Sequence, residues 1–457
     1  MSSKHDAIVV GAGLAGLSAA FELVDKGLQV LLLESAPQVG GRTSNWREDG
    51  MNVESGIHKF VGFYKEFPKL LERAGINLDD IFIYQDELEI RVAEGGEHNA
   101  DPKRRRRSGR FGVTALHRPL KTIGGALGNS ELLSWRDKYQ LVKFFAAGTL
   151  RYLRDPLSLD QMSVAEYARR HGVGDNVIYT VIWSLSSGLF FLPPERYSAY
   201  PFFALAWAGT KGSLRSRIAV FAGGMTDVMA APIAAAISRK GGTVLTGTAC
   251  EKIIFEDGKA SGVVAGGETY NASRVILATP IAPAKKILGA SNGAPEDAEL
   301  AKLMTLPDMS GVAVQIELES PALPEDNVIF GANSILGTFG EQSHTTFRDS
   351  TGRISTFLTP TEPYISMADE DVVAAVIKDL ARQGIDIADR VKNSAVVRHP
   401  SEFYLLEPGS EPRRPTQRTS IPGFALAGDY TKQDLICSME GAVISGRLAA
   451  EAVTAIT

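Results

Sequence analysis

The sequence predicts an α/β protein in which a parallel sheet that binds a dinucleotide is joined to a second domain of mixed α+β structure. Residues 7–43 read as strand, glycine-rich turn, helix, strand and acidic residue, which is the order of a dinucleotide-binding unit. Residues 226–279 and 424–455 again combine short apolar strands with helices. The segments between them carry longer helices and alternating strands, which predicts a separate domain for a substrate.

The glycine-rich turn begins where the short apolar strand 7–10 ends. Gly11 allows a tight turn, Gly13 lets the backbone approach a pyrophosphate, and Gly16 lets the following helix, 17–26, pack closely on the strand. The helix N-terminus favours the negative charge of phosphates. We therefore expect the whole turn to contact the ligand, namely Gly11, Ala12, Gly13, Leu14, Ala15 and Gly16.

A carboxylate and a second glycine pair follow this turn. Glu34, with Ser35 beside it, ends the second apolar strand, where an acid accepts hydrogen bonds from an adenosine ribose. Gly40 and Gly41 let another backbone segment approach the same ligand, and Arg42, followed by Thr43, adds a cation beside the pyrophosphate. Because these parts occur in the right order, a purely structural role for the glycines is a poor alternative.

Composition narrows the function classes. At 457 residues the chain is longer than one ordinary hydrophobic core, so two domains are expected. The net charge of −5 argues against general nucleic-acid binding. Two cysteines, Cys250 and Cys437, form neither a disulfide framework nor a zinc site, and no other metal-ligand cluster is apparent. With a short polar start before the first strand, the expected location is the cytoplasm.

The expected domains are discontinuous. We assign residues 1–60, 215–290 and 415–457 to the dinucleotide domain, and residues 61–214 and 291–414 to the substrate domain. Apolar periodicity predicts several helices and strands in these segments. The helices are 67–74, 132–154, 164–185, 226–239, 369–382 and 443–455, and the strands are 81–84, 89–93, 243–245, 263–265, 275–278, 311–319, 328–330, 355–358 and 395–398.

Two uncharged runs and one basic run stand out in the sequence. Residues 176–194 lack charge but contain three serines and end in Pro193-Pro194, which favours a buried helix and a turn over a membrane span. With residues 197–210, this run suits the wall of a hydrophobic cavity or a surface that dips into a bilayer. The basic run 103–107 can dock on phosphates or an anionic membrane, although a solvated loop is the favoured alternative.

A resemblance to a known family identifies the dinucleotide. Residues 40–43 resemble the FAD-binding motif of the glutathione-reductase-like flavoproteins, in particular the amine oxidase and carotenoid desaturase branch. Residues 54–58 resemble the next segment of that branch, which passes near the flavin. The resemblance implies non-covalent FAD and a glutathione-reductase-like fold. It adds to the expected FAD contacts the residues Gly56, Ile57, His58, Cys250, Ala278, Thr279, Gly428, Asp429, Met439, Glu440 and Ala442.

Further segments narrow the resemblance to the plant and cyanobacterial 15-cis-phytoene desaturases. Residues 119–120 with 129–135, 400–404, 411–418 and 427–446 look like that family. Two departures stand out, because residues 204–208 lack the family's arginine and the basic run 103–107 looks like an insertion. The resemblance implies that the family's arginine lies at its quinone site, so its absence here leaves phytoene itself unsupported as the substrate.

The resemblance implies that a hydride is transferred from a carbon of the substrate to the flavin, while the neighbouring carbon loses a proton. His58, Tyr404 and Tyr430 are candidate proton acceptors, although packing or hydrogen bonding is the favoured role for each. Phe191, Phe202, Trp207 and Tyr404 are expected to contact an apolar substrate. Quinone or O₂ would reoxidise the flavin, and a membrane surface is a further candidate partner.

Two alternatives to an isoprenoid desaturase stay open. The first is a dehydrogenase or oxidase of a smaller cyclic or amine substrate, which the absent arginine supports. The second is a lipid-carrying binding protein with the same architecture, such as Rab GDP-dissociation inhibitor. The glycine pair 40–41, Asp429 and the segment 439–441 count against this second alternative.

Overall fold

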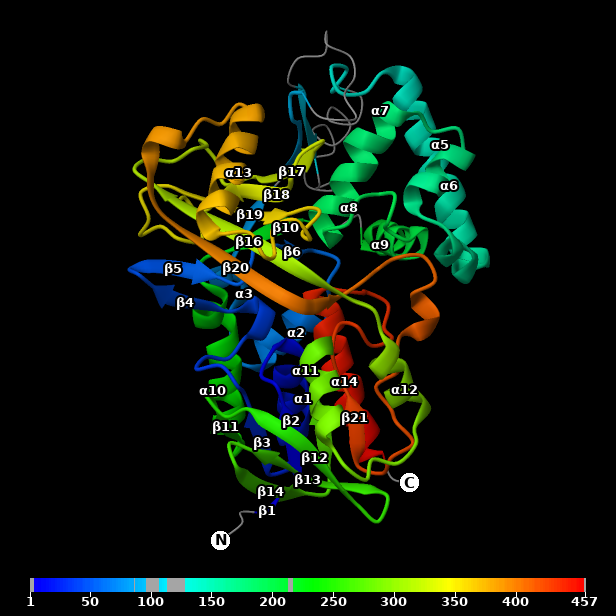
Figure 1. Ribbon diagram of the computed structural model, residues 1–457, viewed down its shortest axis with the longest axis vertical. Coiled ribbons are helices and arrows are strands. Elements are labelled where there is room, and N and C mark those ends of the chain that lie inside the picture. The colour runs from blue at the N-terminus through cyan, green and yellow to red at the C-terminus, as the bar shows by residue number, and fades with distance from the viewer. Residues whose placement is uncertain (1–3, 86, 96–106, 113–127, 213–216, 456–457) are drawn as a thin grey trace.

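The computed structural model describes residues 4–85, 87–95, 107–112, 128–212 and 217–455. Two bodies are stacked along the long axis of the molecule (Figure 1). One is built on a five-stranded parallel sheet and contains both the described N-terminal strand and the last helix. The other is built on a seven-stranded mixed sheet with a block of helices beside it.

The parallel sheet has the strand order β11-β3-β2-β15-β21 and draws on segments far apart in the chain. Short apolar runs form these strands because both faces of the sheet are covered. Side chains alternate between the faces, so that Ala7 and Val9 pack under helices while Ile8 and Val10 face a second sheet. The strands are β2 (Ala7–Val10), β3 (Val30–Leu33), β11 (Thr243–Leu245), β15 (Val275–Leu277) and β21 (Phe424–Leu426).

Helices α1 (Leu14–Asp25), α10 (Ala231–Arg239) and α14 (Met439–Thr454) cover one face. The other face is covered by a smaller sheet and by α11 (Ile281–Ala290). The strand order of the smaller sheet is β1-β14-β13-β12. Its strands are β1 (Lys4–His5), β12 (Cys250–Glu256), β13 (Lys259–Ala265) and β14 (Glu268–Ala272).

The mixed sheet has the order β20-β16-β19-β18-β17-β8-β9, and only the β17–β8 pair is parallel. Helix α13 (Asp369–Arg382) buries Val372, Val376 and Leu380 against this sheet. The strands are β8 (Glu87–Val92), β9 (Arg107–Gly112), β16 (Asp308–Leu318), β17 (Val328–Ala332), β18 (Leu336–Glu341), β19 (Arg353–Leu358) and β20 (Val391–Tyr404).

The helical block packs around an aromatic core. Phe144 contacts Tyr167, Phe202 and Phe203, with ring centroids 5.0–5.9 Å apart. A capping box between Ser134 and Asp137 starts the longest helix. The block comprises α5 (Trp135–Arg154), η2 (Pro156–Gln161), α6 (Val164–Arg170), α7 (Asp175–Val177), the π-turn η3 (Ile178–Ile182), α8 (Trp183–Phe190) and α9 (Ala199–Gly212).

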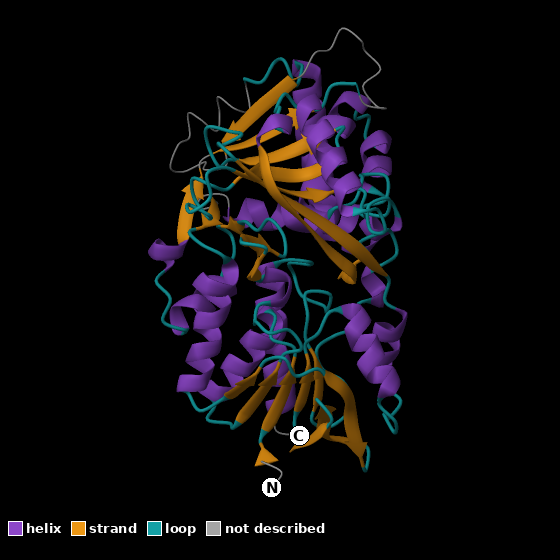
Figure 2. Ribbon diagram, turned by 60° about the vertical axis from the view of Figure 1, so that its left-hand side comes forward, coloured by secondary structure: helices purple, strands orange, loops and turns teal. Residues whose placement is uncertain are grey.

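Smaller elements connect the two bodies, and loops from both meet in the middle of the molecule (Figure 2). They include the hairpin β4 (Asn45–Glu48)–β5 (Met51–Glu54) and the sheet β6-β10-β7 (Phe60–Val61, Ile218–Phe221 and Phe82–Gln85). The remaining helices are η1 (Gly41–Thr43), α2 (Glu66–Arg73), α3 (Leu78–Ile81), the π-turn η4 (Thr226–Ala230), α12 (Ala298–Thr305), η5 (Ala388–Arg390) and η6 (Glu411–Arg413).

The predicted elements differ from the structure mainly at their ends. The first helix begins at Leu14, inside the predicted turn of residues 11–16, and not at Leu17. The predicted helix 164–185 is broken after Arg170, because Gly172 adopts a φ of +72° that ends a helical turn. The basic run 103–107 lies outside the described residues except for the backbone of Arg107. The domain boundaries stay a prediction.

Within the described residues, no helix is both long enough and apolar enough to cross a membrane. The uncharged run 176–194 instead forms η3, α8 and a turn, and much of it is buried.

Candidate active site

A cavity of about 1220 Å³ lies between the two bodies. The loops at the carboxyl ends of the parallel strands line it on one side, and strands β17–β20 with the end of α8 line it on the other. Its volume exceeds the roughly 300–1,000 Å³ of ordinary small-molecule sites. It therefore has room for a dinucleotide together with a second molecule.

The two glycine segments form one end of this cavity. Gly13 and Gly40 form an isolated parallel bridge, and the Gly40 N–H donates to the Ala12 carbonyl over 2.9 Å. A Cβ on Gly41 would lie 3.2 Å from the Cα of Gly13, so side chains at this crossing would push the two segments apart. The resulting cradle is bare backbone, as the approach of a pyrophosphate requires.

Gly11, Gly13 and Gly16 have different surroundings. Gly11 has a φ of +99°, which an L side chain rarely adopts. A Cβ on Gly16 would lie 1.8 Å from the Gly11 carbonyl oxygen, so the helix packs directly on the turn. A Cβ on Gly13 would have no contact closer than 4.0 Å and would extend into open space. The cradle therefore fits a pyrophosphate by its shape.

The carboxylate of Glu34 is held at the edge of the cradle. Its Oε2 accepts from the Ala12 N–H at 2.7 Å, and its Oε1 accepts from the Ala36 N–H at 2.9 Å and from the Ser35 hydroxyl at 3.2 Å. Glu34 is 8% exposed and lines the cavity. These bonds fix the carboxylate where a ribose hydroxyl can donate to it.

An ion pair on the cavity wall joins an N-terminal segment of the chain to a C-terminal one. Arg42 Nη2 lies 2.6 Å from Asp429 Oδ1, and the guanidinium lies 5.0 Å from the ring centroid of Phe403. Burial alone lowers the pKa of Arg42, but the Asp429 carboxylate more than offsets this, so the pKa is raised. Both residues line the cavity.

Three phenylalanines form the opposite end of the cavity. Phe191 ends helix α8 with a left-handed φ of +60°, which is unusual for a bulky residue. Its ring stacks on Phe357 with centroids 3.6 Å apart, and Phe403 meets both rings edge-on at 5.7 and 5.8 Å. This aromatic surface, hereafter the aromatic chamber, opens to the glycine cradle in the same cavity.

All three predicted proton acceptors line the cavity. Burial raises the pKa of Tyr404, whose hydroxyl donates to the Ser410 carbonyl, and also that of Tyr430. Both tyrosines therefore stay protonated. Burial lowers the pKa of His58 to about 4, and its Nδ1 lies 2.7 Å from the Gly56 carbonyl oxygen. Its imidazole is neutral at physiological pH.

Most of the remaining predicted residues also line the cavity. They are Leu14, Ala15, Ser35, Gly40, Gly41, Thr43, Gly56, Ile57, Cys250, Ala278, Thr279, Gly428, Met439 and Ala442. Burial raises the pKa of the Cys250 thiol to about 12, so this side chain is an uncharged wall residue.

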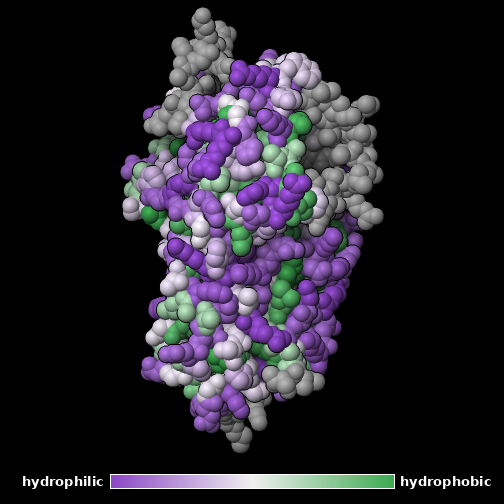
Figure 3. Space-filling model, turned by 90° about the vertical axis from the view of Figure 1, so that its right-hand side faces the viewer, coloured by the Kyte–Doolittle hydropathy of each residue, from purple (hydrophilic) through white to green (hydrophobic). Residues whose placement is uncertain are grey.

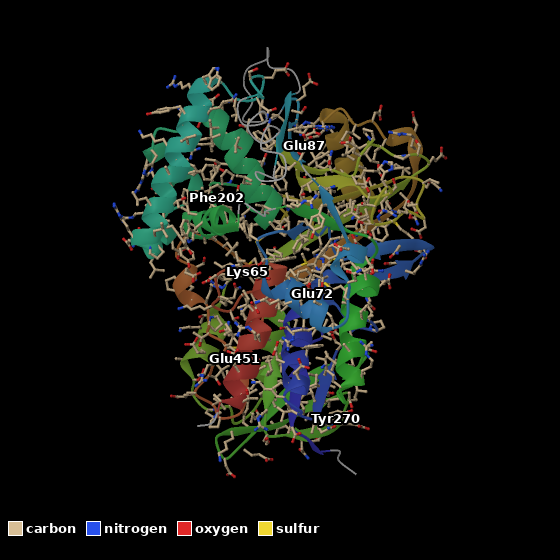
Figure 4. All side chains as sticks on the ribbon, turned by 180° about the vertical axis from the view of Figure 1, so that it is seen from behind. Lys65, Glu72, Glu87, Phe202, Tyr270 and Glu451 are labelled. Carbon is tan, nitrogen blue, oxygen red and sulfur yellow. The ribbon has the colours of Figure 1, made fainter. Side chains whose placement is uncertain are left out.

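Five predicted residues lie away from the cavity lining. Ala12 and Gly16 are behind the cradle. The Glu440 carboxylate is buried at the start of α2, where it accepts from the N–H groups of 65–67 at 2.8–2.9 Å. Phe202 belongs to the aromatic core of the helical block (Figure 4), and Trp207 is half-buried on α9. Neither lines the cavity, so neither is placed to contact a substrate there.

Sequence reasoning missed several cavity residues, among them Lys59, Tyr64, Phe330 and Thr338. Lys59 directly follows the segment 54–58, and strand alternation would have placed it opposite the buried Phe60. The other three carry no local signal, because only tertiary packing brings them to the cavity.

The doubled glycine cradle, the carboxylate held at its edge and the facing apolar chamber define a two-domain, flavin-dependent oxidoreductase. The chain belongs to the flavin containing amine oxidoreductase family, which it matches over residues 14–454. It is 32% identical to the 15-cis-phytoene desaturase of Solanum lycopersicum over 98% of this chain and 77% of that protein. It is 25% identical to the 15-cis-phytoene desaturase of Synechococcus elongatus over 98% and 95%.

Solved structures agree on the fold. An oxidoreductase from Methanosarcina mazei superimposes with a TM-score of 0.75 at 18% identity, covering 98% of this chain and 100% of that one. Wild-type putrescine oxidase bound to putrescine gives a TM-score of 0.73 at 18% identity, covering 98% and 99%. With the family established, the chain is an FAD-dependent oxidoreductase, and the binding-protein alternative is not supported.

Proposed function

We propose that this enzyme introduces C=C bonds into an apolar, isoprenoid substrate of carotenoid type. The observation that carries the proposal is the aromatic chamber, which opens directly to the cradle. Such a surface binds hydrocarbon chains by burying apolar area and offers few hydrogen bonds to a polar substrate. The similarity to phytoene desaturases supports the same substrate class.

The chain's own residues hold the cofactor and shape the reaction space. The cradle at Gly13 and Gly40 would hold the pyrophosphate of FAD, Glu34 the ribose, and Asp429 a ribityl hydroxyl. When bound, FAD accepts a hydride from carbon and passes electrons on to quinone or O₂. The aromatic rings orient the substrate and exclude water. Of the three predicted proton acceptors, only His58 has an unprotonated nitrogen at physiological pH, and its lowered pKa makes it a weak base.

Anaerobic bleaching of the flavin tests this proposal. Purified holoenzyme is mixed with phytoene, shorter isoprenoids, cyclic ketones or amines, and absorbance near the flavin band is followed without oxygen. We expect isoprenoids to bleach the flavin and the products to gain conjugated double bonds. Bleaching by amines alone would replace the proposal with the amine alternative.

Electrostatic repulsion from the cavity wall disfavours a positively charged amine substrate. The cavity wall carries the ammonium group of Lys59, and a second buried cation beside it would be repelled. A smaller cyclic substrate is not opposed by this charge and stays the second candidate for the bleaching assay.

We also propose that the flavin is held without a covalent bond. Burial raises the pKa of the thiols of Cys250 and Cys437, which leaves both un-ionised and poorly nucleophilic. Acid denaturation should release all the flavin into the supernatant. Flavin that stays with the precipitated chain would overturn this assignment.

Helix α5 is the surface we propose for contact with a membrane. It carries most of the strongly exposed large apolar side chains of the described chain, and their helical spacing places several of them on one stripe. They are Trp135 (69% exposed), Tyr139 (70%), Val142 (70%), Leu150 (47%), Leu153 (52%) and, just beyond the helix, Leu157 (53%).

Basic residues of the same helix suit an anionic bilayer. Arg136, Lys143, Arg151 and Arg154 are exposed beside the apolar stripe. This combination is typical of helices that lie in a lipid interface. Hydrophobic and hydrophilic residues are interspersed over the molecular face seen in Figure 3.

Liposome flotation tests the membrane contact. The wild-type protein should float with vesicles that contain anionic lipid, and Val142→Glu with Leu153→Glu should stay at the bottom. A double variant at exposed sites of another helix, Ala374→Glu with Ala381→Glu on α13, adds the same two negative charges and serves as the control. Equal flotation of the α5 variant and the wild type would contradict the proposal.

A further inference from the structure

Lys59 directly precedes strand β6 and places a cation on the wall of the cavity. The next residue, Phe60, pairs with Ala219 in the small sheet and stacks on Phe82 with centroids 4.2 Å apart. Phe60 points into this core, whereas its neighbours Lys59 and Val61 both line the cavity. The packing of Phe60 therefore fixes the backbone that carries Lys59.

The wall of the cavity that Lys59 lines is mostly apolar. Ile57 and Val61 flank it in sequence, and Ile218, Phe330 and Phe357 line the same cavity. Thr338 adds a hydroxyl. Within the part of the chain that the structure describes, Lys59 Nζ has no hydrogen-bond acceptor and no ion-pair partner. An ammonium group in such a place is costly unless something accepts its protons.

The nearest acids form no hydrogen bond or ion pair with Lys59, although Asp326 Oδ1 has no hydrogen-bond partner of its own. Asp326 Oδ2 accepts from the His344 N–H at 3.0 Å and from the Thr345 hydroxyl, and Glu54 Oε2 accepts from Gln342 at 3.1 Å. They act on Lys59 through space, and burial still lowers its pKa to about 8. Neither acid therefore supplies the missing hydrogen-bond acceptor.

The other cations of the cavity wall have different surroundings. Arg42 is paired with Asp429 at 2.6 Å, and Arg398 with Asp369 at 2.5 Å. Lys286 is exposed to solvent on α11. Among the described residues of this wall, Lys59 is thus the cation that has apolar surroundings and whose ammonium N–H groups have no acceptor.

We propose that Lys59 binds a carboxylate at one end of an otherwise apolar substrate. This inference rests on the proposed function, since the rest of the ligand is the isoprenoid chain held by the aromatic chamber. A carboxylate supplies both the opposite charge and the acceptor that Nζ lacks. Lys59 is then a residue that determines specificity, because it selects isoprenoid acids over hydrocarbons.

The test is a binding titration of the oxidised holoenzyme, followed by the shift of the flavin absorbance. The probes are a linear isoprenoid carboxylic acid, the matching primary alcohol and the matching hydrocarbon. We expect the wild type to bind the acid at least about tenfold more tightly than the other two. Lys59→Met should remove this preference, and Lys59→Arg should retain most of it.

Lys65→Met is the matched control. It removes the same charge six positions away, from an exposed residue beside α2 (Figure 4), and should behave as the wild type. Flavin content and melting temperature establish that each variant is folded. The alternative is that Lys59 only neutralises the charge of Asp326. In that case Lys59→Met and Asp326→Asn would lower the melting temperature equally and leave the preference for the acid intact. This result would overturn the proposal.

Two further outcomes separate this inference from the proposed function. Equal affinity of the wild type for acid and hydrocarbon, or no binding of the acid, overturns the role of Lys59 even if hydrocarbons are desaturated. Weaker binding of a quinone, but not of the acid, in Lys59→Met also overturns it and assigns the lysine to the electron acceptor. A Lys59-dependent acid preference without any flavin bleaching supports the carboxylate site and contradicts desaturation.

Discussion

The two ends of the cavity are made of different parts of the polypeptide. The cradle end uses backbone, and its side chains are mostly absent because Gly13, Gly40 and Gly41 meet there. The chamber end uses large side chains, such as Phe191 and Phe357, which come from segments far apart in the chain. A backbone surface is suited to a common cofactor, whereas a side-chain surface can be altered residue by residue to select a substrate.

The largest expected effect is at the cradle. Gly13→Val should fold, because Gly13 has an ordinary φ of −72° and a Cβ there has open space, but the branched side chain would fill the path of the pyrophosphate. We expect a colourless protein that retains its far-UV circular dichroism. Gly289→Val, at an exposed helical glycine with no atom near its Cβ, is the control. Full flavin content in Gly13→Val would show that the cradle does not bind the cofactor.

The ion pair between Arg42 and Asp429 on the cavity wall should give the next largest effect. Arg42→Met or Asp429→Asn leaves a largely buried partner uncompensated, which costs about 3–5 kcal/mol of unfolding free energy. Urea denaturation measures this cost, and the double variant should recover part of it. Arg47→Met breaks an exposed pair with Asp349 and should cost less than about 1 kcal/mol. Equal costs at the two pairs would contradict the assignment of a buried role.

On the chamber side, Glu54 should make stability depend on pH. Burial raises its pKa in the folded protein from 4.5 to about 7. The folded state thus binds this proton more tightly than the unfolded state, so the stabilisation is complete below about pH 4.5 and is lost as pH rises through 7. Glu54→Gln should remove up to about 3 kcal/mol of this decline.

The measurement is the unfolding free energy between pH 5 and pH 8. Glu72→Gln, at an exposed position of α2, is the control and should follow the wild type. A Glu54→Gln variant whose stability declines with pH as steeply as the wild type would show that this carboxyl is not the titrating group.

The smallest expected effect is at the chamber surface. Phe191→Leu removes the ring that stacks on Phe357 at 3.6 Å and should weaken binding of an apolar ligand about tenfold. Flavin content should not change, because the cradle is untouched. Phe202→Leu alters a phenylalanine that does not line the cavity and should leave affinity within about twofold. A larger loss of affinity in Phe202→Leu than in Phe191→Leu would reverse our placement of the substrate wall.

The difference between the cradle and the aromatic chamber also explains why the sequence predicted the first better than the second. The strands, glycines and carboxylate of residues 7–43 were correctly ordered from local pattern, because a tight turn and a short connection determine them. The aromatic chamber was predicted in part, through Phe191, while Trp207 and Phe202 lie elsewhere. Their apolar character alone did not indicate which cavity or core each would face. Glu440 shows most clearly why local sequence pattern cannot predict every contact, since it bonds to the start of a helix 373–375 positions away.

The parallel sheet has a consequence for the order of events during protein synthesis. Its strand β21 and the covering helix α14 lie in the last 34 residues, and a Cβ on Gly446 would come within 2.1 Å of the Ala15 carbonyl oxygen. The turn at residues 11–16 is thus supported by a helix that the ribosome makes much later. A nascent chain cannot form the complete cradle before α14 has been translated. Flavin loading therefore has to wait for α14, and a truncated chain that lacks this helix should leave the ribosome without its cofactor.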